Sequence, residues 1–319
     1  MMDRMNINHL AIFHAVAEEG NISRGAVRLF ISQPAVSKQL AELERSLGTR
    51  LFDRLPKGVR LTEAGQLLHS HSVRLFAVEA EAERALAELH GLQRGRLAIG
   101  ASTTIGNYLL PEILARFHGH YPGIEIALEI GNTEVIQHRL REGKLDLGLT
   151  EGLVDSKELE AEVFLEDELV AIAAPDHPLL KRKNISLRRL CREPFVLREP
   201  GSGTRAVVER ALAGQGFTVL KALSLGSTEA IKRAVATGVG VAIVSRLSIA
   251  VEVETGRLVV IPVSDLSLRR PLHRLQISDR HQGQAVQAFL ALLATQTKPT
   301  NDSAEPSDRC GPHTGRPAL

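Results

Sequence analysis

Cysteine is scarce in this sequence, whose 319 residues include only Cys191 and Cys310. The two lie far apart and no C-x-x-C pair is present, so a disulfide-stapled secreted domain and a thiol redox motif are excluded. No histidines and cysteines cluster at zinc spacing, and His118 and His120 are interpreted as a helix end near the surface. We therefore expect no metal and no cofactor.

Long apolar runs and a secretion signal are also missing. No stretch approaches the roughly 18 consecutive apolar residues that cross a membrane as a helix. The N-terminus has no charged segment followed by an apolar run and a cleavage site. Together with the cysteine usage, these absences predict a soluble, cytoplasmic protein without a membrane partner.

The chain has little excess charge, because its formal net charge is only +2. It is therefore not a polybasic coat for nucleic acid, and any such binding must be local. Residues 1–60 hold nine Lys and Arg against six Asp and Glu. With 44% hydrophobic residues, the sequence is large enough for two or three domains with cores.

Motifs of common enzyme classes are absent as well. No G-x-S-x-G elbow occurs, since the glycines beside Ser202 are its immediate neighbours. The segments GQG at 214–216 and GVG at 238–240 lack the third glycine and the strand-before, helix-after context of a dinucleotide site. We therefore do not expect an enzyme.

What is present begins with residues 21–61, which predict two short helices and a small wing. The first helix is expected at residues 22–29, capped by Asn21 or Ser23. The second opens at Ser32 with a proline in its first turn, where a missing N–H costs little. By pattern alone, an ordinary helical hairpin with a solvated face remains an alternative.

The second helix has the features of a major-groove recognition helix. Apolar residues recur at helical spacing from Val36 to Leu47 and form one face. The opposite side carries short polar side chains and a cation, which can meet base edges and phosphates. The basic wing suits phosphate or the minor groove. The predicted DNA contacts are Ser32, Gln33, Pro34, Ala35, Ser37, Lys38, Arg54, Lys57 and Arg60.

The residue identities are more specific than their pattern. This part of the chain closely resembles the N-terminal domain of the LysR-type transcriptional regulators, above all in the run ISQPAVSKQLAELERSLGTRLFDR and the VRLTEAG that follows it. The match extends from Leu10 to Gly65. The resemblance implies a winged helix-turn-helix domain, residues 1–61, that binds double-stranded DNA. At Gly25 the family usually has alanine. Glycine inside a helix costs roughly 0.5–1 kcal/mol, so we expect this helix to be slightly weakened.

A long helix is expected from Thr62 to about residue 91, spanning roughly 40 Å at about 1.5 Å per residue. Its apolar positions repeat by seven and form a seam that calls for a partner helix; packing along the same chain is the alternative. The resemblance favours pairing with a second subunit, making residues 62–93 a dimerisation linker. The seam consists of Leu61, Leu68, Leu75, Ala82 and Leu89 with Ala64, His71, Val78, Ala85 and Leu92.

From residue 94 short apolar strands alternate with helices, which predicts an α/β fold with mostly parallel sheets. The resemblance implies a two-lobed effector domain, like a periplasmic binding protein, over residues 94–297. Lobe 1 would hold about 94–164 and 267–296, and lobe 2 about 165–266. Strands are expected at 96–100, 124–130, 145–150, 162–165, 169–174, 195–197, 222–225, 241–244 and 258–261, and helices at 105–118, 134–142, 205–214, 228–238 and 282–294.

Four strand-to-helix junctions in this region carry small hydroxyl residues or glycine. In open α/β sheets ligands bind beyond the carboxyl ends of strands, where helix N-termini favour anions. Simple N-capping is the alternative for any one junction, but four together indicate one cleft if the lobes face each other. The candidate effector contacts are Ser102, Thr103, Asn132, Thr133, Thr150, Glu151, Ser202, Gly203, Thr204, Arg205 and Ser227.

The segment EPGSGTR at 199–205 is the most informative junction. Its glycines allow close backbone approach, and Arg205 can grip a carboxylate, sulfate or phosphate with two prongs. GSGTR and the TEG at 150–152 resemble the subgroup with the Calvin-cycle and sulfur- or nitrogen-metabolism regulators, which implies a small anion or anionic metabolite. Glu151 opposes an anion if it points into the cleft unpaired; it could instead orient Arg205 or meet a ligand amine.

We interpret the sequence as a transcriptional regulator that binds a dyad-symmetric promoter site and responds to a small-molecule effector. The family implies a homodimer that assembles further into a homotetramer, and RNA polymerase is a further candidate partner. A cytoplasmic solute-binding protein, or an enzyme using the same cleft, is the alternative. The tail at 298–319 is rich in proline, glycine, serine and charge, and we expect it to be disordered.

Overall fold

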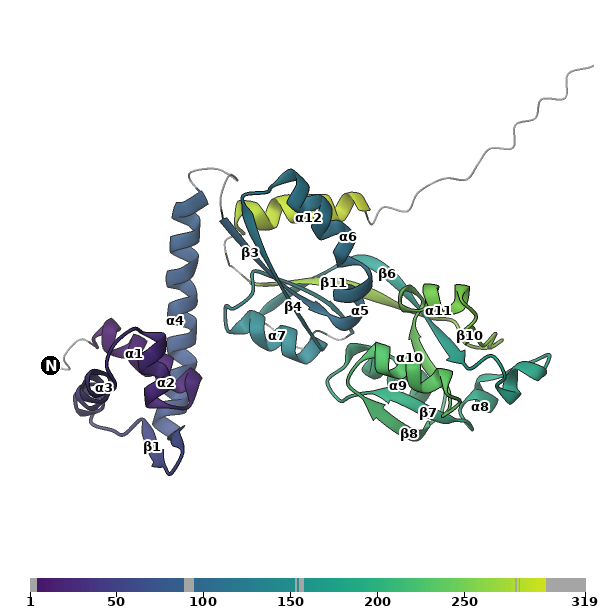
Figure 1. Cartoon of the computed structure of the whole chain (residues 1–319), viewed down its shortest axis with the longest axis horizontal. Helices are drawn as coiled ribbons and strands as arrows, with labels where there is room; N and C mark the ends of the chain where they lie inside the picture. The colour runs from purple at the N-terminus through teal and green to yellow at the C-terminus, as the bar shows by residue number, and fades with distance from the viewer. Residues whose placement is uncertain are drawn as a thin grey trace, which may run out of the picture.

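The computed structural model describes residues 5–88, 95–152, 154, 158–278, 280 and 282–296. They form a helical N-terminal domain, one long helix and a two-lobed α/β region, which follow one another across the molecule (Figure 1). Within these described residues no helix is long and apolar enough to span a membrane. The tail expected to be disordered lies outside them.

The N-terminal domain has the helices and wing that its sequence predicts. The Asn21 side chain caps the second helix by accepting from the N–H groups of Ser23 and Arg24, at 2.9 and 3.1 Å. Gly20 and Gly48 end the first and third helices in the left-handed conformation that glycine favours. The elements are α1 (Ile7–Glu19), α2 (Ile22–Arg28), α3 (Gln33–Leu47), β1 (Phe52–Leu55) and β2 (Gly58–Leu61).

Gly25 lies at a close contact between α1 and α2 that the sequence did not reveal. A Cβ at this position would lie 2.7 Å from Cγ2 and 3.1 Å from Cα of Val16. Helices α1 and α2 therefore approach each other too closely for a larger residue to fit without a shift. The sequence predicted only that the glycine weakens α2. The structure adds that the same glycine allows α1 and α2 to cross closely.

The long helix α4 (Glu63–Glu88) divides the predicted heptad seam between two roles. Its first turns pack on the core of the N-terminal domain, through Ala64 and Leu68. Farther along, the seam residues Leu75 and Val78 are 39% and 65% exposed. The expectation of one continuous dimer seam is therefore wrong for the first two turns, where packing within the same chain prevails. The seam positions Leu89 and Leu92 lie outside the described residues.

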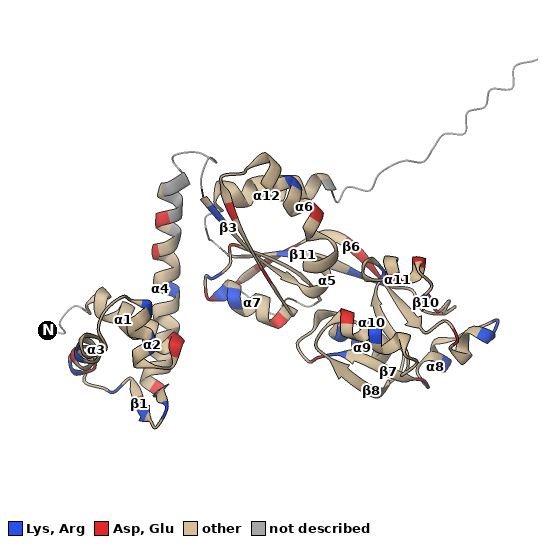
Figure 2. Cartoon of the chain, viewed as in Figure 1, with Lys and Arg blue, Asp and Glu red and all other residues tan. Residues whose placement is uncertain are grey.

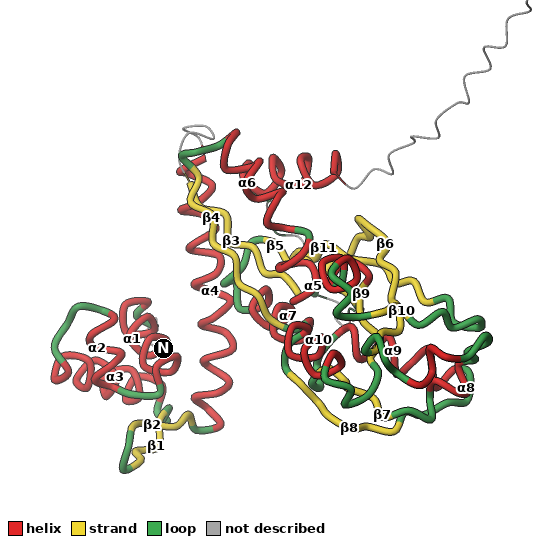
Figure 3. Tube along the Cα trace, turned by 45° about the vertical axis from the view of Figure 1, so that its right-hand side comes forward, coloured by secondary structure: helices red, strands yellow, loops and turns green. Residues whose placement is uncertain are grey.

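Lobe 1 of the α/β region is a sheet covered by helices on both faces (Figure 3). Three of its strands are parallel to one another. A fourth strand runs antiparallel beside them, a fifth runs antiparallel beside the fourth, and these two long strands continue into the second lobe. The strands are β3 (Gly95–Ser102), β4 (Ile124–Gly131), β5 (Leu147–Glu151), β6 (Leu159–Ala173) and β11 (Leu268–Ile277). The helices are α5 (Thr103–Tyr108), α6 (Leu110–His120), α7 (Thr133–Arg141) and α12 (Gln284–Gln296).

Lobe 2 has its own apolar core, built around the distal half of β6. The main sheet has the order β10-β6-β11-β5-β3-β4, with β9 also paired to β6, while β7 and β8 form a separate parallel pair. The elements are 3-10 helices at Pro178–Lys181 and Arg246–Ser248, helices α8 (Leu187–Leu190), α9 (Gly203–Gly214), α10 (Thr228–Ala236) and α11 (Ala250–Glu254), and strands β7 (Pro194–Arg198), β8 (Leu220–Leu225), β9 (Ala242–Ser245) and β10 (Val259–Val260).

Three sequence expectations for this region were wrong in detail. The strands predicted at 162–165 and 169–174 are one strand, β6, because the acidic residues between them pair with arginines on neighbouring elements instead of forming a turn. The helix predicted at 105–118 is two helices that meet at Leu109. The main sheet is mixed instead of mostly parallel, since β6 and β11 cross between the lobes.

Candidate functional site

The recognition helix α3 presents its N-terminal turn to solvent. Val36, Leu40 and Leu43 hold its other side in the domain core. Of the predicted contacts, Gln33 and Lys38 are exposed and Ser37 is half-buried. The Ser32 hydroxyl accepts from the Ala35 N–H at 3.4 Å, so this residue caps the helix. The exposed turn can therefore approach base edges while its backbone stays fixed.

The wing stands at one end of the same domain, and basic residues lie on it and on α3 (Figure 2). Arg54, Lys57 and Arg60 are all exposed, and only Arg60 has a carboxylate near it, Asp53 at 3.4 Å. The Val59 N–H donates to the Gly20 carbonyl at 2.9 Å, which fixes the wing against the end of α1. The wing cations are thus held beside the recognition helix and available to phosphate.

Sequence reasoning missed one exposed side chain beside the recognition helix. Phe30 lies in the turn between α2 and α3, is 95% exposed and has a φ of 55°. A large apolar residue in a left-handed conformation is unusual, because only glycine adopts it without strain. This residue marks the turn as a further candidate for contact with DNA.

The effector-side junctions do converge where lobe 2 meets lobe 1. The Thr133 hydroxyl donates to the backbone carbonyl of Glu151 at 2.8 Å. A Cβ on Gly203 would lie 2.0 Å from that same carbonyl oxygen, so the first turn of α9 rests directly on the end of β5. Glycine is required here because the two backbones touch.

The Glu151 carboxylate lies at the centre of this contact and is 2% exposed. It accepts hydrogen bonds from Ser102, from Thr104 at 3.4 Å and from Thr204 at 3.3 Å. Its nearest cation is Arg270, with an Nη1–Oε1 distance of 3.6 Å. Glu151 is therefore paired, and its partner is Arg270 instead of the Arg205 that we considered from the sequence.

Arg270 links Glu151 to a second buried carboxylate. It is 1% exposed and donates to Asp167 through Nε at 2.8 Å and through Nη2 at 2.7 Å. It also donates to the Thr204 hydroxyl at 2.8 Å, and Ser245 donates to Asp167 at 2.8 Å. One guanidinium thus serves two carboxylates, and this buried centre carries a net charge of −1.

A second arginine, Arg198 at the end of β7, connects the lobes. Its guanidinium donates to the Thr103 hydroxyl of lobe 1 and to Thr228 of lobe 2, both at 3.2 Å. It also pairs with Glu199 at 2.8 Å. Burial opposes ionisation of Glu199, but the hydrogen bond and charge of Arg198 and the Asn132 side chain outweigh it and lower the pKa of this carboxyl.

Three predicted effector residues act as helix caps in this structure. The side chains of Asn132, Ser202 and Ser227 accept from backbone N–H groups at the starts of α7, α9 and α10. For Ser227, which is half-buried, the N-capping alternative accounts for the side-chain hydrogen bond, which it accepts from the Ala230 N–H at 3.1 Å. Thr150 differs, because its hydroxyl is buried and has no hydrogen-bond partner.

Arg205 lies at the mouth of the cleft instead of its centre. Its guanidinium binds Glu209 at 2.9 Å and the Arg198 carbonyl at 3.1 Å. It borders a cavity of about 560 Å³ that opens between the N-terminal turns of α7 and α9. The cavity is also lined by Thr133, Gly201, Ser202, Gly203, the acidic residues Glu134 and Glu209, and Arg141. The N-terminal turns of two helices, one from each lobe, therefore border one opening.

A separate contact closes the lobes on the α5 side. The Tyr108 hydroxyl donates to Glu229 of α10, and Lys232 lies 5.1 Å from the centre of the Tyr108 ring. Lys232 also pairs with Glu229 at 2.7 Å and with Glu252 at 2.8 Å. Burial and the Glu229 carboxylate raise the pKa of Tyr108 to about 12, so the phenol stays protonated as a donor.

Sequence reasoning missed Arg198, Asp167 and Arg270 among the buried polar residues. Arg198 lies between the predicted strand at 195–197 and the EPGSGTR junction, and that position could have indicated a role in the cleft. Asp167 and Arg270 are 103 residues apart in the sequence, and no local pattern joins them. Among the residues that the structure describes, no group of three His, Cys, Asp or Glu could hold a metal ion.

Family models and curated proteins match almost the whole chain. A model described as LysR substrate binding domain matches residues 90–298, and one described as bacterial regulatory helix-turn-helix protein, lysR family, matches residues 7–66. The RuBisCO operon transcriptional regulator of Allochromatium vinosum is 38% identical over 285 residues, which cover 89% of this chain and 94% of the relative. The transcriptional activator CmpR of Synechocystis sp. is 35% identical over 292 residues, covering 92% and 96%.

Solved structures agree with this relationship. The regulatory domain of CcmR from Synechocystis PCC6803, in complex with 2-PG, aligns with a TM-score of 0.61 and 33% identity over 65% of this chain and 99% of that chain. Full-length CbnR, complexed with target DNA, aligns with a TM-score of 0.65 over 91% of this chain and 99% of that one. At 20% identity, CbnR shows the fold alone.

These findings confirm the family and the architecture that the residues predicted. The matching models cover both the helix-turn-helix domain and the effector region, and the relatives are named as transcriptional regulators instead of enzymes. The chain belongs to the LysR family of bacterial helix-turn-helix transcriptional regulators.

Proposed function

We propose that this regulator binds dyad-symmetric promoter DNA in the bacterial cytoplasm and changes its DNA contacts when a small anionic metabolite binds between its lobes. Residues 1–61 would bind DNA, 62–93 dimerise and 94–297 sense the effector. Its two lobes would divide near residues 165 and 267, where β6 and β11 leave one apolar core for the other. The convergence of helix N-termini from both lobes on one cavity carries the proposal.

The cavity at the cleft mouth suits an anion better than the buried centre does. The first turns of α7 and α9 border it with their positive dipole ends, and Arg205 and Arg141 offset the carboxylates of Glu134 and Glu209 on its wall. In the centre the Glu151 carboxylate already takes up the hydroxyl donors of Ser102, Thr104 and Thr204. A second anion there would face the net negative charge of that centre.

Two relatives support a metabolite as the effector. The CcmR regulatory domain, 33% identical to this chain, was solved in complex with 2-PG. The relative of Allochromatium vinosum is named as a regulator of the RuBisCO operon. The predicted effector contacts stay a proposal, with Thr133, Ser202, Gly203 and Arg205 at the cavity as the residues that we expect to touch the ligand.

The test is thermal unfolding of the full-length protein against sulfate, sulfite, phosphate, nitrate, small carboxylates, sugar phosphates and 2-PG. A ligand at about 100 times its Kd stabilises the folded state by about 2.7 kcal/mol, which is a readable shift. We expect one anion to stabilise the wild type and Arg205→Gln to reduce its affinity at least tenfold.

Arg210→Gln is the matched control, since Arg210 is an exposed arginine farther along α9 and does not line the mouth cavity. Loss of affinity with both variants would show a general charge effect and not a site. A panel without any anionic hit would reject the anion and turn attention to amines that could pair with Glu151.

Dimerisation through α4 rests on the exposed part of the heptad seam. Leu75 and Val78 are large apolar seam residues that this chain leaves exposed, which is unusual on an otherwise charged helix. We expect Leu75→Glu with Val78→Glu to convert the protein to monomers, because the glutamates would be buried against the partner helix. Sedimentation equilibrium measures this change.

Glu79→Gln with Glu83→Gln is the control for surface changes on α4, since both glutamates are exposed in the described structure. A double glutamate variant that keeps the wild-type mass would place the subunit interface elsewhere. A homotetramer through the effector lobes would appear as dimers in the same experiment, because only the α4 contact is removed.

A further inference from the structure

Helix α7 connects the effector cleft to the opposite end of lobe 1. Its start lies in the cleft, where the Thr133 hydroxyl donates to the Glu151 carbonyl at 2.8 Å and the Glu134 N–H donates to Gly201 of lobe 2 at 3.4 Å. Its end leads into the turn Glu142-Gly143-Lys144. A short helix is stiff, so a displacement at one end moves the other end as well.

The turn at residues 142–144 contacts the DNA-binding part of the chain. The Lys144 ammonium lies 2.8 Å from a carboxylate oxygen of Glu18, at the end of α1, and 3.2 Å from Glu142. The side chains of Glu18 and Glu142 are only 14% and 17% exposed. Burial opposes ionisation of Glu18, but the hydrogen bond and charge of Lys144 outweigh it and lower the pKa of this carboxyl.

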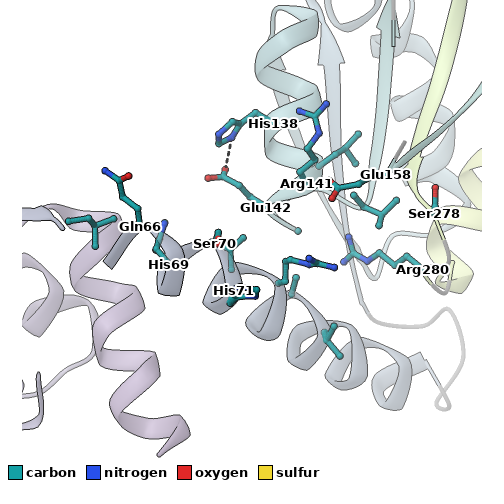
Figure 4. Close-up of a pocket in the computed structure, with 18 residues that line it drawn as sticks. Gln66, His69, Ser70, His71, His138, Arg141, Glu142, Glu158, Ser278 and Arg280 are labelled. Atoms are coloured by element: carbon teal, nitrogen blue, oxygen red, sulfur yellow. Dashed lines mark ion pairs between the residues drawn. The ribbon is translucent and has the colours of Figure 1, made fainter. Parts of the chain in front are cut away.

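Backbone packing accompanies this ion pair. Gly143 has a φ of +68°, and a Cβ on it would lie 2.4 Å from Cβ and 3.3 Å from Cα of Ala77 in α4. The turn therefore rests directly on the long helix, and glycine is needed both for the conformation and for the contact. Beside this contact lies a cavity of about 980 Å³ between α4 and lobe 1, bordered by His71, Arg141 and Arg280 (Figure 4).

Glu18 is held from a third direction by α4. His69 Nε2 lies 3.5 Å from Glu18, and the rings of His69 and His14 stack with centroids 5.4 Å apart. His14 Nδ1 in turn lies 3.1 Å from the buried hydroxyl of Ser72. One carboxylate thus joins α1, α4 and lobe 1, and its position depends on all three.

We propose that the contact of the 142–144 turn with Glu18 and Ala77 sets the orientation of the helix-turn-helix domain relative to the effector lobes of the same subunit. Movement of α9 against the start of α7 would reach the recognition helix through this contact. Only this second step rests on the proposed effector response. The orientation itself is a property of the chain without ligand, and it decides whether two recognition helices of an oligomer meet both halves of a DNA site.

The test uses full-length protein without effector and three variants: Lys144→Glu, Glu18→Lys and both together. The DNA is the dyad-symmetric fragment that the wild type selects from a random-sequence library, and a single half-site cut from it. We expect each single variant to lose about tenfold affinity for the full site, roughly 1.4 kcal/mol, with unchanged half-site affinity. The double variant restores the ion pair in reverse and should recover most of the full-site affinity.

Lys181→Glu is the matched control, because Lys181 is an exposed lysine of lobe 2 shortly before α8 in the sequence, and α8 lies at the opposite end of the molecule from α1 (Figure 1). Hydrogen exchange at residues 14–20 and 70–80 adds a readout without DNA; it should rise in both single variants and fall in the double variant. Full-site affinity that is unchanged in the single variants, or that falls further in the double variant, would overturn the proposal. So would equal losses on the half-site, since they would place the effect in the recognition helix itself.

Discussion

Arg270→Met is expected to destabilise the effector region by about 3–5 kcal/mol, the cost of breaking a buried ion pair by removing one partner. The guanidinium of Arg270 serves Asp167 and Glu151, which are 3% and 2% exposed. Methionine fills similar space, so the loss would come from two uncompensated buried carboxylates and not from a cavity. Urea unfolding followed by tyrosine fluorescence measures it, since both tyrosines, Tyr108 and Tyr121, lie in lobe 1.

The neighbouring Arg269 provides a matched control. It lies on the same strand, is exposed, and pairs with exposed Glu166 at 3.8 Å. An exposed pair contributes about 0–1 kcal/mol, so Arg269→Met should be nearly neutral. Adding Asp167→Asn to Arg270→Met should recover part of the loss, because it removes one of the stranded charges. Similar losses for the two arginine variants would show that burial of the pair does not govern stability here.

The Arg270 centre also shows where sequence reasoning ends. Local signals sufficed for the helix-turn-helix: the caps at Asn21 and Ser32 and the apolar spacing of α3 placed α2 and α3. They failed at residues 166–168, three acidic residues in a row, where the prediction ended one strand at residue 165 and began the next at 169. In the structure the middle one, Asp167, is buried against Arg270, and that partner is supplied by a strand 103 residues away.

The linker helix α4 shows the limit of a heptad repeat as a signal. The repeat indicates that one face of the helix is apolar, but it does not say which residues cover that face. In α4 the burial of this face changes along the helix. Leu68 packs on the chain's own core, whereas Leu75 and Val78 remain exposed. Only tertiary contacts separate the two uses. Glycines and hydroxyl residues at strand ends marked the strand-to-helix junctions correctly, but helix capping by Asn132, Ser202 and Ser227 is also a reason for them to recur there.

The effector centre resolves the question that Glu151 raised. An unpaired carboxylate would have argued against an anionic ligand, but Glu151 is satisfied by hydroxyls and by Arg270. In the buried centre, the Glu151 carboxylate already accepts from the hydroxyl groups that an external anion would need. An anion can instead bind at the cleft mouth without displacing Glu151, provided that helix N–H groups and Arg205 supply its contacts.

Gln33→Ala and Ser37→Ala are expected to relax the sequence preference of the regulator, each weakening binding to the selected site by about 1–3 kcal/mol. The two residues lie one turn apart in the first half of α3. Val36 and Leu40 hold the other side of the helix in the domain core. Binding to random DNA should hardly change, because neither residue carries charge and phosphate contacts dominate non-specific affinity. Titration of specific and random duplexes at one salt concentration measures the difference.

Lys38→Ala is the comparison that separates base contact from phosphate contact. Lys38 lies on the same exposed turn with its nearest carboxylate, Glu42, 4.0 Å away, so its ammonium is available to DNA. If it meets a phosphate, its removal weakens specific and random binding alike and reduces the salt dependence by about one unit of slope. If Gln33→Ala or Ser37→Ala weakened binding to both duplexes equally, direct base contact by α3 would be rejected. The exposed turn at Phe30 would then be the next candidate for sequence specificity.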